Sequence, residues 1–222
     1  MSPIPTRQRA EPAESGPVRQ ALRVRRALAA VFFASGAAGL AFELVWFDRA
    51  ALVFGDAVWS TSIVLSSFMG GLALGNAIAS ARGHRLHRPL RVYAALETIV
   101  GLSGLAVTYL LPALSLVLTP VMRPLIDHPW LASLVRVPVA FAVLLVPATA
   151  MGATLPVLVT ALNRVDTSFG RVLGQLYGWN TLGAVGGVLF TEIVLIARVG
   201  TVRTAWIAAV LDLAAAAVAA TL

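Results

Sequence analysis

Residues 57–80 read AVWSTSIVLSSFMGGLALGNAIAS, a run of 24 residues that contains no charged side chain. A helix needs about 20 mainly apolar residues to cross the roughly 30 Å hydrocarbon core of a bilayer. Five other stretches of similar length hold one or two charges each, so the sequence predicts an all-α membrane protein. The predicted spans lie near 27–47, 57–80, 91–111, 130–150, 173–197 and 203–222.

The overall composition agrees with this fold class. Of the 222 residues, 59% are hydrophobic and only 12% are charged, whereas about a quarter of the residues in soluble domains carry charge. Eight of the charged residues precede residue 27, so residues 27–222, the predicted transmembrane domain, are poorer still in charge. A water-soluble globular domain is therefore excluded.

Residues 1–26 combine Pro, Ser, Glu and Arg with few large apolar groups. Such a segment cannot bury enough apolar surface to fold alone, so we expect a disordered basic cytoplasmic tail. The apolar stretch that follows is too long for a signal peptide. The net charge of +7 does not imply a nucleic-acid partner, because the arginines concentrate in this tail and in the 81–91 loop. The absence of cysteine excludes disulfides and thiolate chemistry.

Two proline-containing segments leave the number of spans open. Four prolines interrupt residues 112–129, which we expect to form a re-entrant or interfacial connector and not a clean helix. Residues 151–163 are apolar but follow Pro147 and contain Pro156. They either extend the fourth span or lie along the inner membrane surface, so the sequence predicts six or seven spans.

The distribution of arginine and tryptophan predicts the orientation. Cytoplasmic loops are enriched in arginine, which places the tail and the 81–91 loop inside. Trp46, Trp59, Trp130 and Trp206 then fall at the outer helix ends, where aromatic belts are expected. With six spans, both termini lie on the cytoplasmic side of an inner (plasma) membrane.

Small residues repeat every four positions in two of the spans. Gly71 and Gly75 share one face of the second span, and Gly183 and Gly187 share one face of the fifth. Such faces let helix backbones approach closely in lipid, so we interpret them as packing surfaces. A backbone-lined substrate path is the alternative interpretation.

Ionisable residues inside predicted spans are the candidate functional groups, because each is costly in lipid and needs a partner. Glu43, Arg136 and Glu192 are predicted at one depth near the outer surface. They would form either an ion pair that fixes helix packing or a cation site beside Trp46, whose ring can hold an ammonium group. Asp212 lies near mid-membrane without a cationic partner, so we expect it to be protonated or to contact another segment or subunit.

Other polar residues give weaker signals. Glu97 is expected to be paired with arginines of the 81–91 loop or with interfacial water, and Asn180 to make an interhelical hydrogen bond. The histidines His84, His87 and His128 lack the spacing of a metal site, and none is predicted.

Several motifs, taken together, carry a family resemblance. They are residues 33–40 (FASGAAGL) with Glu43 and Trp46, 71–76 (GLALGN), 93–97 (YAALE), 147–158 (PATAMGATLPVL) and 174–189 (GQLYGWNTLGAVGGVL). Their order resembles the amino-terminal membrane region of integral-membrane spermidine-synthase-like proteins, which join a major-facilitator-like part to a spermidine synthase. The resemblance covers about residues 30–200. The remaining positions that match the family motifs are Ser35, Gly36, Gly39, Glu97, Met151, Gly152, Thr154, Pro156, Tyr177, Asn180, Thr181 and Gly183.

The resemblance implies that catalysis and membrane attachment belong to different parts of such proteins. In that family, aminopropyl transfer to a diamine belongs to a soluble carboxy-terminal domain of Rossmann-like methyltransferase fold. Nothing in these 222 residues resembles its glycine-rich strand–loop–helix, so no catalytic residue, cofactor or enzymatic activity is assigned to this chain. We expect a non-catalytic membrane module that anchors or positions a cytosolic aminopropyltransferase domain or a membrane assembly. Six spans would correspond to half of a major-facilitator fold.

The sequence leaves two alternative functions open. One is a carrier or binding protein for a polyamine or another cation, with Glu43, Glu192 and Asp212 countering ammonium charge. The other is a structural subunit of a larger membrane complex.

Overall fold

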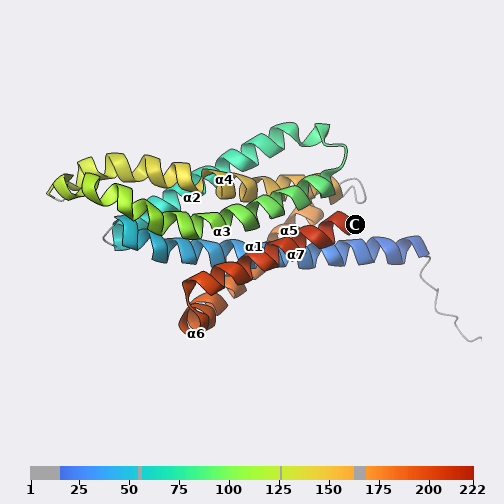
Figure 1. Cartoon of the computed structure of the whole chain (residues 1–222). Coiled ribbons are helices and arrows are strands. Elements are labelled where there is room, and N and C mark those ends of the chain that lie inside the picture. Colours follow the sequence, from blue (N-terminus) through green and yellow to red (C-terminus); the bar gives the residue numbers. More distant parts are fainter. Residues whose placement is uncertain (1–15, 55–56, 126, 163–168) are drawn as a thin grey trace, which may run out of the picture.

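The computed structural model describes residues 16–54, 57–125, 127–162 and 169–222, and all regular structure in these ranges is helical (Figure 1). Six helical segments of the described chain are long and apolar enough to cross a membrane, which confirms the predicted all-α bundle with six such helices. Five are α1 (Gly16–Phe54), α2 (Ala57–Arg82), α3 (Pro89–Met122), α4 (Pro129–Leu162) and α7 (Thr201–Thr221). The other joins α5 (Phe169–Phe190), the π-helical segment η3 (Thr191–Ile196) and α6 (Ala197–Val199). Short 3-10 turns, η1 (Gly83–Arg85) and η2 (Arg123–Leu125), follow α2 and α3.

The first helix is longer than the sequence prediction. Of the predicted disordered tail, residues 1–15 lie outside the described residues, but residues 16–26 are helical and belong to α1. Seven of these eleven residues are Arg, Ala, Leu or Gln, which are good helix formers, and extending an existing helix adds one hydrogen bond for each residue. The Arg25 side chain also donates a hydrogen bond to Gln175 of α5.

The predicted connector at 112–129 is wrong over its first half, because α3 continues through Pro112 and Pro120 to Met122. Each proline removes one backbone donor, which a helix tolerates where neighbouring helices and side chains support it. Leu111 and Leu118 are both buried in the same hydrophobic core. Packing on both sides of Pro112 therefore offsets the lost hydrogen bond.

The fourth span is extended in the same way. Helix α4 passes through Pro147 and Pro156 and ends at Leu162, so residues 151–162 continue the span, and Asn163 lies outside the described residues. The Thr160 hydroxyl donates to the Pro156 carbonyl at 2.8 Å. Within the described ranges, this favours six spans over seven.

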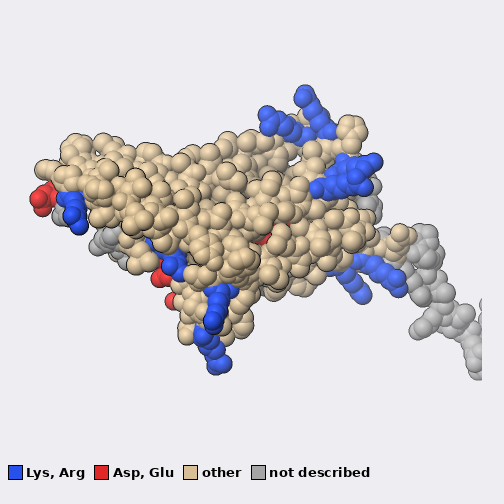
Figure 2. Space-filling model, in the orientation of Figure 1, with Lys and Arg blue, Asp and Glu red and all other residues tan. Residues whose placement is uncertain are grey.

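Helices α1 and α3 occupy the middle of the bundle. Helix α2 packs mainly on α4, α7 packs on both α3 and α1, and α5 packs mainly on α1 (Figure 1). The carboxyl end of α7 and the first turns of α1 lie at the same end of the bundle. Arginine side chains gather at this end, which also holds η1 and the start of α3 (Figure 2).

Glycines of α2 allow close approach to α4. A Cβ at Gly75 would meet the Thr149 backbone, and one at Gly71 would meet the Cβ of Ala148. Burial of small side chains on both helices thus replaces the side-chain interdigitation of a soluble core.

The contact between α1 and α5 is built in the same way. A Cβ at Gly183 would meet the backbone of Phe33, and one at Gly187 would meet that of Ala37. By contrast, a Cβ at Gly186, on another face of α5, would meet nothing within 4 Å. The α1–α5 pair therefore depends on the two glycines that face α1.

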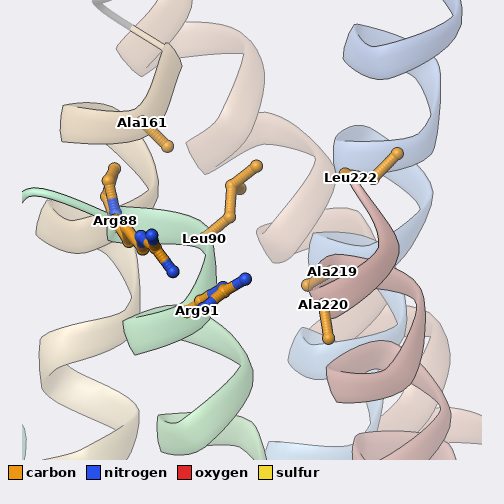
Figure 3. Close-up of a pocket in the computed structure, with 8 residues that line it drawn as sticks. Arg88, Leu90, Arg91, Ala161, Ala219, Ala220 and Leu222 are labelled. Atoms are coloured by element: carbon orange, nitrogen blue, oxygen red, sulfur yellow. The ribbon is translucent and has the colours of Figure 1, made fainter.

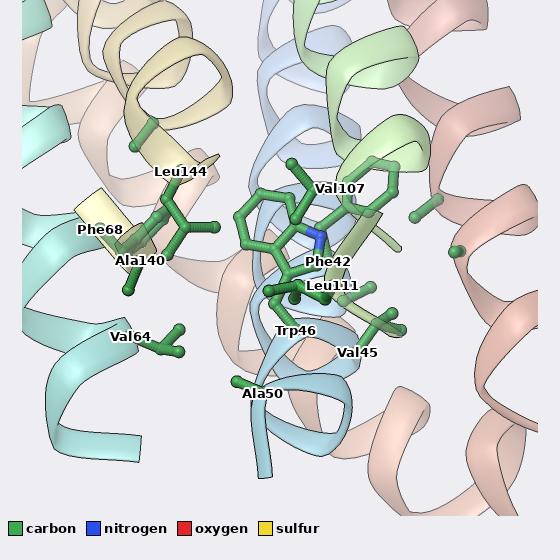
Figure 4. Packing of buried hydrophobic residues seen from close by; sticks show 14 of the residues in the cluster. Phe42, Val45, Trp46, Ala50, Val64, Phe68, Val107, Leu111, Ala140 and Leu144 are labelled. Carbon is green, nitrogen blue, oxygen red and sulfur yellow. The ribbon is translucent and has the colours of Figure 1, made fainter. Parts of the chain in front are cut away.

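Large side chains fill the space where α1, α2, α3 and α4 diverge. Trp46 and Phe42 of α1 meet Phe68 of α2, with Leu111 of α3 and Leu144 of α4 around them (Figure 4). A second buried cluster, around Phe32, Tyr93 and Leu158, lies nearer the arginine-rich end.

We predict that Gly183→Ala lowers the free energy of unfolding in mild detergent by about 1–3 kcal/mol, because the added methyl group forces α5 away from α1. Gly186→Ala is the matched control and should raise the stability by up to about 1 kcal/mol, because alanine has the higher helix propensity. Thermal unfolding of both variants checks this. Equal effects would show that the α1–α5 contact does not limit stability.

Candidate functional site

A group of buried polar side chains lies where α1, α3 and α7 meet. Ser35 comes from α1, Tyr93 and Glu97 from α3, and Asp212 from α7. Tyr93, Glu97 and Asp212 are each 0% exposed. Positions 93, 97 and 101 of α3 are four residues apart and share one helix face, which points the polar groups into the same interface.

Few hydrogen bonds satisfy these groups. The Ser35 hydroxyl donates to Glu97 Oε1 at 2.8 Å. The Glu97 carboxyl lies close enough to both Tyr93 and Asp212 to interact with them electrostatically. Nevertheless, the Tyr93 hydroxyl, Glu97 Oε2 and both Asp212 carboxyl oxygens are buried without a hydrogen-bond partner.

A glycine on α3 brings Asp212 into this position. A Cβ at Gly101 would lie 3.3 Å from the Asp212 Cβ and 3.3 Å from the Ala209 carbonyl oxygen. Most of the other buried residues of α7 are alanines, including Ala208 and Ala215. Small residues on both helices thus hold the two carboxyl groups together.

No arginine neutralises the buried acids. In the described ranges, Glu97 and Asp212 make no ion pair, and their interactions are confined to each other, Tyr93 and Ser35. The expected pairing of Glu97 with the 81–91 loop is therefore replaced by Ser35. An ionised carboxylate without a cation costs several kcal/mol in this environment, so the site suits either neutral carboxyl groups or a bound positive charge.

The expected cluster of Glu43, Arg136 and Glu192 does not form. Glu43 is buried, whereas Glu192 is exposed to the surroundings of the bundle. Arg136 is partly buried and its Nε has no hydrogen-bond partner. No ion pair joins these three residues, all of which the structure describes.

The length of α1 explains this difference. Because α1 continues to Phe54, Glu43 is about 16 Å from the carboxyl-terminal end of its helix, and not near that end as the shorter predicted span placed it. Gly39 of α1 packs on Met151 of α4, which fixes the register of these antiparallel helices. Arg136 lies about 22 Å from Met151 and Glu43 about 6 Å from Gly39 in the same direction, so about 16 Å separates the two charged residues along the bundle.

Trp46 is also placed differently from the prediction. It is fully buried, stacks on Phe42, meets Phe68 edge-on and donates from Nε1 to the Gly104 carbonyl at 3.2 Å (Figure 4). It therefore belongs to the core and not to an outer aromatic belt, and aromatic neighbours occupy the ring that was expected to hold a cation. The exposed tryptophans are Trp59, Trp130, Trp179 and Trp206, and Trp206 Nε1 donates to the Tyr109 hydroxyl at 3.0 Å.

Most other positions of the family motifs lie at helix contacts. Asn180 Nδ2 donates to the Phe32 carbonyl at 3.2 Å, as expected for an interhelical hydrogen bond, and the Asn180 backbone lies against Gly36. Gly152 packs on the backbone of Leu72. Elsewhere, Thr154 donates to the Met151 carbonyl, Thr181 donates to the carbonyl of the exposed Tyr177, and Pro156 accepts from Thr160.

A pocket of about 430 Å³ opens at the arginine-rich end of the bundle. The Arg88 and Arg91 side chains turn toward this space, opposite the end of α7 (Figure 3). The other lining residues are Pro89, Leu90, Ala161, Ala219, Ala220 and Leu222. The buried acids do not line it. No group of three His, Asp or Glu residues that could hold a metal ion occurs in the part of the chain that the structure describes.

Comparison with known proteins finds similarity to polyamine aminopropyltransferases. It is 27% identical over 187 residues to "Polyamine aminopropyltransferase 1" of Streptomyces coelicolor, an alignment that covers 83% of this chain and 32% of that protein. It is 28% identical over 217 residues to the "Polyamine aminopropyltransferase" of Mycobacterium tuberculosis, covering 96% of this chain and 38% of that protein. The chain thus spans about a third of the length of these relatives. No protein-family model and no solved structure matches it.

Sequence reasoning identified Glu97 and Asp212 but did not bring them together. A usable signal was present, because Tyr93, Glu97 and Gly101 follow one another at intervals of four residues. That spacing places a glycine and two polar residues on one face of the helix. A second helix can approach closely at the glycine and can bring its own polar residue to this face.

We predict that Glu43→Gln and Arg136→Gln change stability additively, within about 0.5 kcal/mol, because the two side chains are far apart. The positive control is the pair Ser35→Ala and Glu97→Gln, which share a hydrogen bond and should couple by more than about 0.5 kcal/mol. Unfolding of the single and double variants in mild detergent measures both couplings. Coupling of about 1 kcal/mol or more between positions 43 and 136 would contradict this expectation and would support the ion pair predicted from the sequence.

Proposed function

We propose that this chain is the membrane module of a polyamine aminopropyltransferase system and that it anchors or positions a cytosolic aminopropyltransferase domain. The observation that carries this proposal is the uneven coverage of the alignments. They include 83% to 96% of this chain but only 32% to 38% of the relatives, which are named for aminopropyl transfer. The helical bundle thus corresponds to a part of those proteins, and the family resemblance of the sequence motifs implies that aminopropyl transfer belongs to a soluble part outside it.

The arrangement of the helices supports such an anchor. Six spans bring the start of α1 and the end of α7 to the same end of the bundle (Figure 1). Arginines gather at that end, and membrane proteins keep such residues on the cytoplasmic side (Figure 2). A domain held at this end of a bundle in the inner (plasma) membrane would lie in the cytosol.

The second candidate function is a carrier or binding protein for a polyamine. It is favoured by one observation, namely that Glu43, Glu97 and Asp212 are buried acids without an ion pair in the described ranges. Two features oppose it. The acids are 0% to 5% exposed, and none of them lines the pocket at the arginine-rich end.

The anchoring role predicts that residues 16–222 can replace the matched segment of the Streptomyces coelicolor relative. The chimaera should sediment with membranes and retain aminopropyltransferase activity, whereas the relative without its matched segment should remain in the soluble fraction. An unrelated six-span segment serves as control. Lower activity with that control than with this chain indicates positioning, and equal activity indicates anchoring alone. A chimaera that reaches the membrane but is inactive, while the control is active, would contradict the proposal.

The orientation predicts the accessibility of single cysteines, which can be introduced without background because the chain has no native cysteine. His84 lies in η1 and His128 precedes α4, and both are exposed at opposite ends of the bundle. A membrane-impermeant maleimide applied to intact cells should label His128→Cys at once and His84→Cys only after lysis. The reverse labelling pattern would place the arginine-rich end outside the cell. It would contradict the proposed cytosolic position of the aminopropyltransferase domain.

A further inference from the structure

The polar atoms between α1, α3 and α7 have no role in anchoring a soluble domain. Four of them, the Tyr93 hydroxyl oxygen, Glu97 Oε2 and the two Asp212 carboxyl oxygens, are buried and make no hydrogen bond of normal geometry, although Tyr93 and Asp212 both lie beside Glu97. Buried polar groups are normally hydrogen-bonded, and leaving each one unpaired costs about 1–3 kcal/mol. Apolar residues of the same size would fill this interface at lower cost, which indicates that the groups serve a ligand.

Packing limits what that ligand is. Tyr93, Glu97 and Asp212 are all 0% exposed, and the residues that line the pocket belong to other positions. The site has no room for a polyamine, and a metal ion would need more oxygen ligands than the free atoms supply at close range. A proton is the one cation that adds no volume.

Among the described residues, four polar side chains interact at the site. Ser35 is the polar contribution of α1, Tyr93 and Glu97 are those of α3, and Asp212 is that of α7. No arginine interacts with them in the described structure. A proton held between the two carboxyl groups would remove the repulsion of two adjacent negative charges and would supply a donor for an unpartnered oxygen.

We propose that Glu97 and Asp212 form a buried proton-binding site that exchanges its proton when α7 separates from α3. On release, the O–H bond of one carboxyl group breaks, its electron pair stays on the carboxylate oxygen, and the proton passes to water. Uptake is the reverse step, with water as the donor. The Tyr93 hydroxyl, beside Glu97, is placed to donate a hydrogen bond to the carboxylate that remains.

The α3–α7 contact connects the site with the arginine-rich end. It is made largely by alanines against Gly101, so no large side chain lies between the two helices there. Ala219, which lines the pocket at the arginine-rich end, lies about 10 Å along α7 from Asp212. Water that enters from this pocket along the α3–α7 contact therefore has a short distance to travel. This inference does not depend on the proposed anchoring function.

Infrared spectroscopy of the purified full chain tests the proposal. At neutral pH the wild type should show the C=O stretching band of a protonated carboxylic acid. Glu97→Gln and Asp212→Asn should each remove part of that band, and Glu192→Gln, which alters an exposed acid, should leave it unchanged. Loss of no intensity in either buried variant would overturn the proposal. If a variant does not fold, the carboxylic acid band of the wild type is titrated with pH instead. Absence of this band at neutral pH would also overturn the proposal.

Two further measurements separate the proton from other ligands and test the opening step. Spermidine or Na⁺ added at constant pH should leave the band unchanged, and its disappearance would identify a different cation and overturn the proposal. Gly101→Leu, which wedges α3 from α7, should speed exchange of the carboxyl proton with D₂O by at least about tenfold. Gly186→Leu, where nothing lies within 4 Å, should not. Equal exchange rates in the two variants would contradict the opening step.

Discussion

Close backbone contact between helices is the constraint on which this bundle depends. Lipid tails are as apolar as the helices themselves, so burial of apolar surface does not drive their association, and van der Waals contact must do so. Gly75 against α4, Gly183 against α1 and Gly101 against α7 bring three pairs of helices together at points where a methyl group would not fit or would be tight. Large side chains such as Trp46 then occupy the wider spaces between these contacts.

The same close packing determines the chemistry of the interior. Because α7 approaches α3 so nearly, Asp212 has Glu97 as its neighbour, and solvent is excluded from both. Arginine side chains gather at one end of the bundle (Figure 2). Arg136 is partly buried, but no described arginine interacts with Glu97 or Asp212. The site therefore holds acids without a base, which distinguishes it from a structural salt bridge, since that would contain both.

Much of the fold follows from local properties of the sequence. The absence of charge over residues 57–80 was enough to predict a span, and the six helices follow from the same criterion. Helix ends were predicted less well, because a membrane sets a minimum span length and no maximum, so α1 extends to Phe54 and α4 to Leu162. The extension of α1 places Glu43 and Trp46 away from the predicted surface. The meeting of Glu97 and Asp212 depends on how α3 and α7 pack, which the pattern within either helix does not specify.

Placing Asp212 on α7 has a consequence for biosynthesis. Helices leave the ribosome in chain order, so α3 enters the bilayer with Glu97 well before α7 is made. Until then Ser35 of α1 is the available hydrogen-bond partner of Glu97, and the Glu97 carboxyl group lies on a face of α3 that is not yet covered. Helix α7 covers this face when it packs on α3. A nascent chain that stalls before this point would leave Glu97 without its neighbour on α7 and would expose an acid at membrane depth, which is energetically costly.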